Sequence, residues 1–535
     1  MVNDVFKKCI KKGFLLDKEV LNLFNELNEE ESSEIIEVIG NLKMNERIIT
    51  KKVLTRFISE IKTNISFDFE KINFFFNLFE KEFINESNKE IKTNNSKNFK
   101  ILSAPFFPQR KVSVLDFVNH FKDRFENIKK ILETKNLENL TTIRKIKGNT
   151  GNFSFIGSVL DKRITKNKNI MLDVEDLTGS INVLINSNKK EVYEKAKDII
   201  LDDIIGFNVS SSNNFLYCND LIYPDCVLKE KKRIEEDEWV VFISDLHCGS
   251  KLFLEDNFLK FIKWINGKQG DEEYRNIAEK VKYLFITGDL VDGVSHYPGQ
   301  EKDLKIMTSV GQYAKVEELL KLIRGDIQIF ACPGNHDAVW VGEPQPIISE
   351  QWAEGLHKMP NLELVTNPCL IEIEGSFKIL MYHGASLNPF VEELPEIRAK
   401  YGKHSPTTIV KEVLKRRHLS PMHGLVDYIP CDKDSLVINP VPDIILTGDL
   451  HRCEVSMYNN ILLVAGSCWQ AQTNFMEKVG VEADPNKAIL FNLKSREIKI
   501  IDFSDEDKNV QWLKDPKLYC PYDCNFNGGN EDKSI

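Results

Sequence analysis

The fold is decided by the stretch Trp239-Val240-Val241-Phe242-Ile243-Ser244-Asp245-Leu246-His247, in which an apolar run ends in a carboxylate and an imidazole. The run has no helical periodicity and predicts a buried β-strand. Four later apolar runs end in the same way, before Asp289, before Asn335-His336-Asp337, before His383 and before Asp449-Leu450-His451. Because ligands bind at the carboxyl ends of strands in open α/β sheets, we expect the five clusters to meet on one rim.

The side chains of these clusters predict a two-metal site. Asp245 and His247 are two residues apart, so a strand end can aim both the same way. Asp289 follows the second strand and can bridge two ions about 3.5–4 Å apart. Further ligand atoms are expected from Asn335, His383 and His451. Oxygen and imidazole ligands together suit two divalent ions, with Mn²⁺ favoured over Mg²⁺, Fe²⁺ or Zn²⁺.

The same clusters predict hydrolysis of a phosphoester. Two ions can clamp a phosphate while a metal-bound water acts as the nucleophile. His336 follows the ligand Asn335 and is placed to protonate the leaving oxygen, and Asp337 is expected to orient His336. One Asp-x-His at a strand end is more often a satisfied polar pair, but five clusters in order favour a catalytic centre that uses His336, Asp289 and Asp337.

The rest of the chain predicts several domains. Apolar residues recur at helical spacing before and after a polar stretch, and later three strands, a short helix and two more strands follow in the order of an OB-type barrel. The predicted organisation is a helical interaction domain over 1–84, a flexible linker over 85–112, a helical connector over 113–141, an OB-fold domain over 142–228, a metallophosphoesterase domain over 238–503 and an acidic tail over 504–535.

Composition excludes some classes of protein. The net charge of −10 over 535 residues does not indicate a nucleic-acid binder, so any surface that binds nucleic acid must be a local basic one. No stretch approaches the roughly 20 apolar residues of a membrane helix, and the start of the chain has no apolar signal core. Scattered cysteines favour a reducing compartment, and we expect a cytoplasmic protein.

Two basic groups are candidate DNA contacts. The segment from Arg398 to His418 holds seven Lys or Arg against one acidic residue and includes Lys415, Arg416 and Arg417. Such a strip can guide a phosphate backbone, although a solvated helix face or a subunit interface would look the same. Lys162 and Arg163 belong to the first barrel hairpin, where a basic groove can hold a single strand, with a purely structural role as the alternative.

The five motifs resemble those of the calcineurin-like metallophosphoesterases, which read D-x-H, G-D-x-x-D, G-N-H-D/E, H and G-H-x-H. The resemblance covers about Glu238 to Ile501. It implies a four-layer α/β domain, a β-sandwich flanked by helices, within a multidomain α+β chain, and it implies two Mn²⁺-type ions. The fifth motif departs from the family, because Asp449 stands where the first His is usual, and we expect Asp449 to offer a metal an oxygen instead.

The order of the predicted domains resembles the small subunits of the archaeal family-D DNA polymerases. Matching segments include Lys415 to Pro421, Asn439 to Asp443 and Gly466 to Thr473. The resemblance implies a metal-dependent 3′→5′ exonuclease that proofreads DNA within a polymerase complex. The implied partners are a large catalytic subunit, primer–template or single-stranded DNA, and a sliding clamp. The alternatives are a non-catalytic scaffold subunit with a degenerate metal site and a stand-alone phosphoesterase.

Overall fold

The computed structural model describes residues 98–105, 112–212, 215–431, 433–478 and 480–504, together with a few positions near the start. The chain divides into two units, Met1–Lys97 and Asn98–Ile535. In the first unit the short strands β1 (Leu15–Leu16) and β2 (Ile48–Ile49) pair in parallel, where helices were predicted. Ile48 and Ile49 are β-branched and favour extended backbone. Most of the helical domain predicted over 1–84 lies outside the described residues. So does the predicted tail 504–535, apart from Ser504.

The first sheet of the second unit carries three of the five strands that the motifs predicted. Its order is β12-β11-β10-β9-β18-β19, with β9 to β12 parallel and the last two strands antiparallel. The strands are β9 (Trp239–Ser244), β10 (Val281–Thr287), β11 (Gln328–Cys332), β12 (Leu362–Leu364), β18 (Lys487–Asn492) and β19 (Ile498–Asp502).

The second sheet carries the other two predicted strands, β14 and β15. Its order is β16-β17-β15-β14-β13-β3. The strands are β3 (Phe99–Ser103), β13 (Cys369–Ile373), β14 (Phe377–Met381), β15 (Ile444–Thr447), β16 (Glu454–Tyr458) and β17 (Ile461–Ala465). Strand β3 pairs with β13, so part of the segment predicted as a flexible linker over 85–112 is an edge strand of this sheet. Its five residues, Phe-Lys-Ile-Leu-Ser, are too few to show the period of a strand, and a polar run precedes them.

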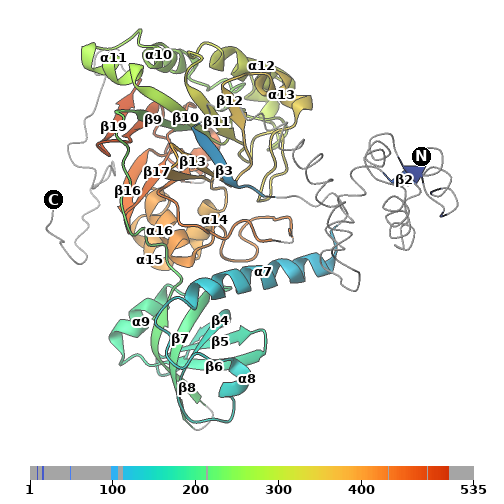
Figure 1. The fold of residues 1–535 in the computed structure, drawn as a ribbon, viewed down its shortest axis with the longest axis vertical. Coiled ribbons are helices and arrows are strands. Elements are labelled where there is room, and N and C mark those ends of the chain that lie inside the picture. The colour runs from blue at the N-terminus through green and yellow to red at the C-terminus, as the bar shows by residue number, and fades with distance from the viewer. Residues whose placement is uncertain are drawn as a thin grey trace, which may run out of the picture. The chain divides into compact units, whose positions relative to one another are not determined.

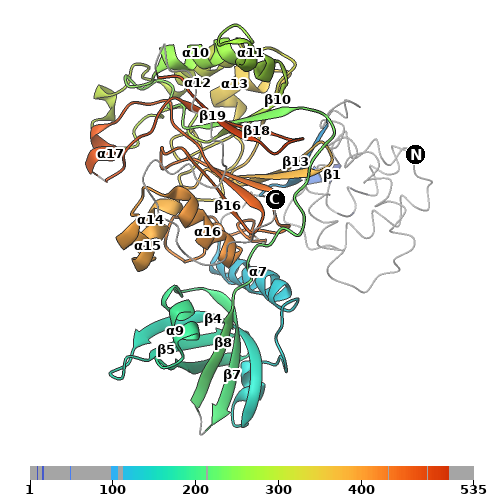
Figure 2. The same cartoon turned by 90° about the vertical axis from the view of Figure 1, so that its left-hand side faces the viewer.

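The two sheets pack face to face and helices cover both outer faces, which gives four layers (Figures 1 and 2). Strand β9 shows the arrangement, because Val241 and Ile243 belong to the core under the first group of helices and Val240 and Phe242 to the core between the sheets. The first sheet is covered by α10 (Glu255–Ile265), α11 (Glu272–Glu279), α12 (Ser309–Leu320) and α13 (Glu350–His357). The second is covered by α14 (Leu387–Glu392), α15 (Pro395–Lys400) and α16 (Pro406–Arg416).

A closed five-stranded barrel with the order β4-β5-β6-β8-β7 precedes these layers. It comprises β4 (Gly151–Ile164), β5 (Ile170–Asp176), β6 (Gly179–Ile185), β7 (Ile204–Ser212) and β8 (Phe215–Ile222), with α9 (Lys190–Lys197) between the third and fourth strands. Phe155 and Phe207 stack in its core with ring centroids 4.9 Å apart. Helices α7 (Val114–Leu132) and α8 (Ile143–Ile146) lead into it. The element order is the predicted one, and the OB-fold assignment stays a prediction.

The helices of the described residues fall short of what a bilayer requires. None of the helices there is both long and apolar enough to cross a membrane.

Candidate metal centre

The predicted ligands follow the carboxyl ends of their strands and converge from both sheets. Asp245 and Asp289 follow neighbouring parallel strands β9 and β10 of the first sheet, whereas His383 and Asp449 follow β14 and β15 of the second. Backbone hydrogen bonds tie the loops together, since the amide of Gly448 donates to the carbonyl of His383 at 2.7 Å and that of Asp245 to the carbonyl of Gly288 at 3.1 Å. The rim predicted from the sequence is therefore formed by two sheets, not one.

Five of these residues have left-handed backbone, namely Asp245, His247, Asp289, Asp449 and His451, with φ between 47° and 63°. This conformation costs a non-glycine residue roughly 1–2 kcal/mol, and such strain collects at functional sites. The two Asp-Leu-His stretches have the same alternation, with both outer residues left-handed and the leucine between them 1% exposed. The buried leucine anchors each turn while the polar side chains on either side of it face the centre.

One group of ligand atoms comprises Asp245, His247 and His451, whose candidate donor atoms all lie within 4.8 Å of one another. His451 Nε2 lies 3.4 Å from Asp245 Oδ1 and 3.0 Å from His247 Nε2. Two imidazole nitrogens at this separation suit a shared cation. Asp245 Oδ2 is buried and has no hydrogen-bond partner among the described residues. Buried carboxylate oxygens are normally satisfied, so a cation is the missing partner that this geometry suits.

A second group lies around His383. Its Nε2 is 3.0 Å from Asn335 Oδ1 and 3.9 Å from Asp449 Oδ1. Asp289 lies between the two groups, because its Oδ2 is 3.5 Å from His247 Nε2 and 3.4 Å from His383 Nε2. One carboxylate oxygen thus reaches an imidazole of each group, as a bridging ligand of two cations would.

The imidazole tautomers leave Nε2 available as the ligand atom. His383 Nδ1 lies 3.1 Å from the carbonyl oxygen of Thr287, which can only accept, so Nδ1 carries the proton. His247 Nδ1 lies 3.2 Å from Asp292 Oδ1, and the pKa of Asp292 is held below its usual value by His247 despite burial, so Asp292 also accepts. In its neutral form each ring therefore has its lone pair at Nε2, the atom that lies near Asp289.

Glycines allow the loops to approach the ligands closely. A Cβ at Gly334 would lie 2.2 Å from Asp289 Oδ1 and 2.6 Å from His383 Nε2. A Cβ at Gly448 would lie 2.6 Å from Asp245 Oδ2. Since real Cβ atoms do not come this near, a side chain at either position would displace ligand atoms.

The charges of the centre are strongly coupled. Burial alone would favour the neutral form of Asp289, but His383 and His336 outweigh it and hold the pKa of Asp289 well below its usual value. Burial also opposes the charged form of His383, yet Asp289 holds the pKa of His383 well above its usual value. Burial raises the pKa of Asp449 to about 6. Divalent cations would favour ionised aspartates and neutral imidazoles here, which is the donor set that they bind.

Asp292 also belongs to the candidate centre, although the sequence alone assigned it no role. It orients His247 and is itself held by two buried glutamines. Gln470 Nε2 donates to Asp292 Oδ1 at 2.8 Å, and Gln300 Nε2 donates to Asp292 Oδ2 at 3.2 Å. The signal for Asp292 was its place in the G-D-x-x-D motif, whereas nothing in the sequence distinguished Gln300 or Gln470 from ordinary polar residues.

His336 lies beside the centre, with its ring centroid 4.9 Å from that of His247. Its Nδ1 is 2.9 Å from the carbonyl oxygen of Asp292, so that carbonyl orients it. The prediction that Asp337 orients His336 is wrong. Its carboxylate accepts from the amides of Gly334 and Leu290 at 2.8 and 3.2 Å and from the hydroxyl of Tyr313 at 2.8 Å, so it supports the ligand loops. Burial raises the pKa of Asp337 to about 7.

Two of the three predicted DNA contacts of the basic strip, Arg416 and Arg417, are buried, whereas the contact of the partly exposed Lys415 with DNA stays a prediction. Arg416 Nε binds Asp203 Oδ1 of the barrel at 2.8 Å, and its side chain is 2% exposed. Arg417 Nε donates to the carbonyl of Ile438 at 2.7 Å and is buried. Lys415 Nζ lies 3.4 Å from Asp198 of the barrel. Lys415 and Arg416 therefore join the barrel to the four-layer domain, whereas Arg417 binds within the four-layer domain.

The barrel lysine and arginine differ from each other. Lys162 Nζ donates to the carbonyls of Lys197 and Ile199 at 2.6 and 2.8 Å, so its ammonium group supports the end of α9. This structural role replaces the DNA contact predicted for Lys162. Arg163 is exposed on β4, and its contact with DNA stays a prediction.

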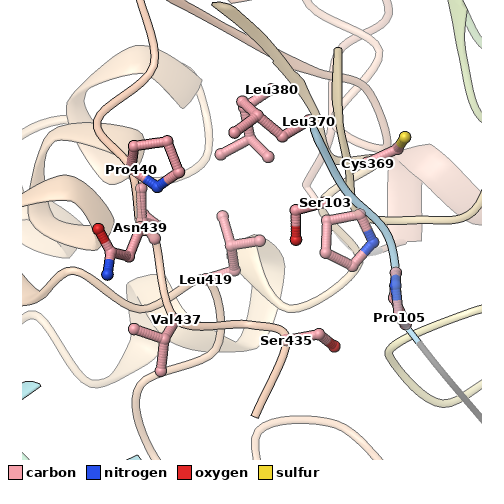
Figure 3. Close-up of a pocket in the computed structure, with 12 residues that line it drawn as sticks. Ser103, Pro105, Cys369, Leu370, Leu380, Leu419, Ser435, Val437, Asn439 and Pro440 are labelled. Atoms are coloured by element: carbon pink, nitrogen blue, oxygen red, sulfur yellow. The ribbon is translucent and has the colours of Figure 1, made fainter. Parts of the chain in front are cut away.

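A separate cavity lies where the end of β3 meets the segment 435–440 (Figure 3). Its lining is largely apolar, with Leu370 and Leu380 of the second sheet facing Leu419 and Pro440. None of its lining residues is an Asp, Glu, His, Lys or Arg. The cavity therefore lacks the groups for metal or acid–base chemistry that the converging loops provide.

Known proteins share this sequence pattern. Residues 240–455 match the family model that describes the B subunits of DNA polymerases alpha and epsilon. The DNA polymerase II small subunit of Methanothermobacter thermautotrophicus is 36% identical over 364 residues, covering 68% of this chain and 74% of that protein. That of Archaeoglobus fulgidus is 36% identical over 380 residues, covering 71% of this chain and 75% of that protein.

Among solved structures, that of an archaeal phosphodiesterase has a TM-score of 0.25 at 14% identity, covering 49% of this chain and 98% of that chain. A likeness this slight bears on neither the fold nor the activity. The relatives in sequence, by contrast, are similar over most of both chains. This chain therefore belongs to the family of archaeal DNA polymerase II small subunits, the small subunits of family-D DNA polymerases, as its resemblance implied.

Proposed function

We propose that this chain is a metal-dependent 3′→5′ exonuclease that removes nucleotides from the end of a DNA strand within a two-subunit DNA polymerase. The observation that carries the proposal is the position of Asp289, whose Oδ2 lies 3.5 Å from His247 Nε2 and 3.4 Å from His383 Nε2. A carboxylate shared by two imidazole-containing groups is the arrangement that phosphodiester hydrolysis with two cations requires.

The residues fit two divalent ions, with Mn²⁺ preferred by the mixture of carboxylate, amide and imidazole ligands. One ion would be held by Asp245, His247 and His451, and the other by Asn335, His383 and Asp449, with Asp289 shared. When bound, the ions supply Lewis-acid activation of water and stabilise the charge on the phosphate.

His336 is proposed to assist the leaving group. Its Nδ1 donates its proton to the carbonyl of Asp292 at 2.9 Å, which fixes the ring, and the imidazolium form would carry a second, transferable proton at Nε2. His336 is only partly buried, so a substrate oxygen can reach it. A proton held at Nε2 would pass to the 3′ oxygen as its bond to phosphorus breaks.

The family membership supports the choice of DNA and of a large catalytic subunit as the partner. The barrel contributes by position, because Arg416 and Asp203 fix it to α16. We infer that the large subunit carries the polymerase site and delivers a mispaired strand end to the metal centre.

The test is mononucleotide release from a 3′-mismatched primer by the full-length chain with Mn²⁺, alone and with its large subunit. Asp289→Asn keeps the shape of the side chain and removes its charge, and it should lower the rate by about 100-fold or more. The exposed Asp256→Asn serves as the matched control and should leave the rate unchanged. If wild-type protein releases nothing in either form, the proposed activity is wrong.

A second candidate function is that of a non-catalytic scaffold subunit. It is favoured by Asp449, which replaces an imidazole of the related enzymes with a carboxylate whose pKa burial raises to about 6. Metal analysis separates the two functions. Fewer than two ions per chain, with unchanged binding to the large subunit after Asp289→Ala, would support the scaffold.

A further inference from the structure

Two aromatic side chains form a partly exposed pair beside the metal centre. Tyr297 lies in the loop between Asp292 and the short helix η2 (Gln300–Lys302), and Phe475 lies on α17 (Asn474–Lys478), which Figure 2 labels. Their rings are nearly parallel, with an interplanar angle of 8° and centroids 6.3 Å apart. Phe475 is 59% exposed. We name this pair the aromatic shelf.

The shelf is anchored to the metal centre through Asp292. Gln300 is 1% exposed, binds both the carbonyl and the carboxylate of Asp292, and accepts from the amide of His296 at 2.9 Å. Gln470 holds Asp292 Oδ1 from the other side, at the start of the segment that carries Phe475. Both parts of the shelf are thus fixed to the residue that orients His247.

A row of rings runs from the ligand His247 to His296, the residue before Tyr297. The centroid of His336 lies 4.9 Å from that of the ligand His247, and the centroid of His296 lies 4.7 Å from that of His336, in a stacked arrangement. Tyr297 follows His296 directly in the chain. The row of rings therefore ends one residue before Tyr297, so the loop that carries the shelf begins at the residues proposed to cleave the phosphodiester.

The shelf is held rigidly although it is partly exposed. The hydroxyl of Tyr297 donates to Asp303 Oδ2 at 2.9 Å, which fixes the plane of its ring. Met476, next to Phe475, is buried, and Gln472 donates to the carbonyl of Val481 at 2.8 Å and accepts from the amide of Ala483 at 2.7 Å. Such fixing of rings before a ligand arrives lowers the entropic cost of stacking.

We propose that the aromatic shelf stacks an unpaired base at the 3′ end of the DNA strand and so places its phosphodiester at the metal centre. The proposal rests on the proposed exonuclease function and adds a substrate-binding site to it. A flat π-face accepts every base, as a proofreading site must, and stacking on an aromatic ring is worth about 1–3 kcal/mol per base. A paired base at the end of a duplex is held by hydrogen bonds to its partner and by stacking on its neighbour, so the shelf would select frayed or mismatched ends.

The test removes the ring and the base separately. Full-length Phe475→Ala should lower kcat/KM on a single-stranded oligonucleotide by roughly 5- to 100-fold. On the same oligonucleotide with its last two nucleotides abasic, the variant should equal wild type. Phe475→Leu should behave like Phe475→Ala because leucine is apolar without a flat face, and Phe475→Tyr should restore activity. Leu322→Ala removes an apolar side chain of similar exposure, 51%, far along the sequence and should change nothing.

Binding without turnover keeps this proposal separate from the exonuclease function. Fluorescence anisotropy of the same two oligonucleotides, measured with EDTA, should show the same dependence on Phe475 and on the base. If binding shows it while wild type hydrolyses nothing, the shelf stands and the exonuclease proposal fails. Equal losses of activity on normal and abasic ends would overturn the shelf, as would equal activity of Phe475→Ala and Leu322→Ala. The shelf would also be overturned if Phe475→Ala lost tight binding to the large subunit.

Discussion

Asp449 Oδ1 lies 3.9 Å from His383 Nε2, within the same group of ligand atoms as Asn335. The residue that departs from the metallophosphoesterase motif that this sequence resembles therefore still lies among the candidate ligands. Its backbone is left-handed, with φ of 63°, like that of Asp245 in the first Asp-Leu-His stretch. The turn at Asp449 thus has the same left-handed geometry as the first Asp-Leu-His stretch, and both begin with a carboxylate.

Substitution of Asp449 should change the number and the kind of bound ions. Asp449→Ala should leave one firmly bound ion per chain and lower exonuclease activity by about 100-fold or more. Loss of a residue that only hydrogen-bonds a metal ligand already lowers affinity or activity by about 10- to 100-fold, and loss of a ligand should cost more. Asp449→His should keep two ions and shift preference toward Zn²⁺, which imidazole suits. Elemental analysis after dialysis measures both. Two ions in Asp449→Ala would show that Asp449 is not a ligand.

Asp292 should act on the metal through His247. Asp292→Ala removes the carboxylate that accepts from His247 Nδ1 at 3.2 Å, so the ring loses its fixed tautomer. We expect a loss of about 10- to 100-fold in Mn²⁺ affinity, with the fold intact. Titration calorimetry of wild type, Asp292→Ala and the exposed Asp256→Ala provides the comparison. An unchanged affinity would exclude this orienting role.

Arg416 should matter for stability and not for DNA. Arg416→Ala leaves the buried Asp203 without its partner, and burial already raises the pKa of Asp203. Removal of one partner of a buried ion pair costs about 3–5 kcal/mol in unfolding free energy. Urea unfolding should show this loss in Arg416→Ala and none in Arg163→Ala, which replaces an exposed residue. A stable Arg416→Ala variant with weakened DNA binding would restore the interpretation of the basic strip as a DNA contact.

Stability should fall as the pH is lowered from 6.5 toward 4. Burial, helped by Arg124, lowers the pKa of His418 from 6.5 to about 4, and the ring contacts the buried Asp434 at 2.9 Å. Between these two pH values the unfolded chain binds a proton at His418 that the folded chain does not, so protonation favours unfolding by about 1.4 kcal/mol per pH unit. Thermal unfolding at pH 7.5 and pH 5 should therefore differ more for wild type than for His418→Asn. Equal differences would show that His418 does not titrate in this way.

The sequence predicted the strand ends well because each strand is a buried apolar block with no ambiguity of period. Asp245, His247, Asp289, Asn335, His383 and His451 all lie where a strand end should place them. The four layers also follow from these strands. Val240 and Val241 lie on opposite faces of the sheet and both are apolar, so each face must be covered by another layer. These features depend on local pattern, which a single sequence contains.

Features that depend on contacts between distant segments could not be predicted. Arg416 belongs to a strip that is basic in sequence, but its partner Asp203 comes from a barrel 213 residues earlier in the chain. Asp337 adjoins His336 in sequence, yet its carboxylate turns to the amides of Gly334 and Leu290. In both cases neighbours in space, set by packing of separate elements, decided the role of the side chain.

The position of bound metal tests the proposed centre most directly. Crystals grown with Mn²⁺ and measured at the manganese absorption edge should show two anomalous peaks about 3.5–4 Å apart, with Asp289 between them. One peak should lie against Asp245, His247 and His451, and the other against Asn335, His383 and Asp449. A single peak, or two peaks that Asp289 does not join, would contradict the two-metal centre proposed for this chain.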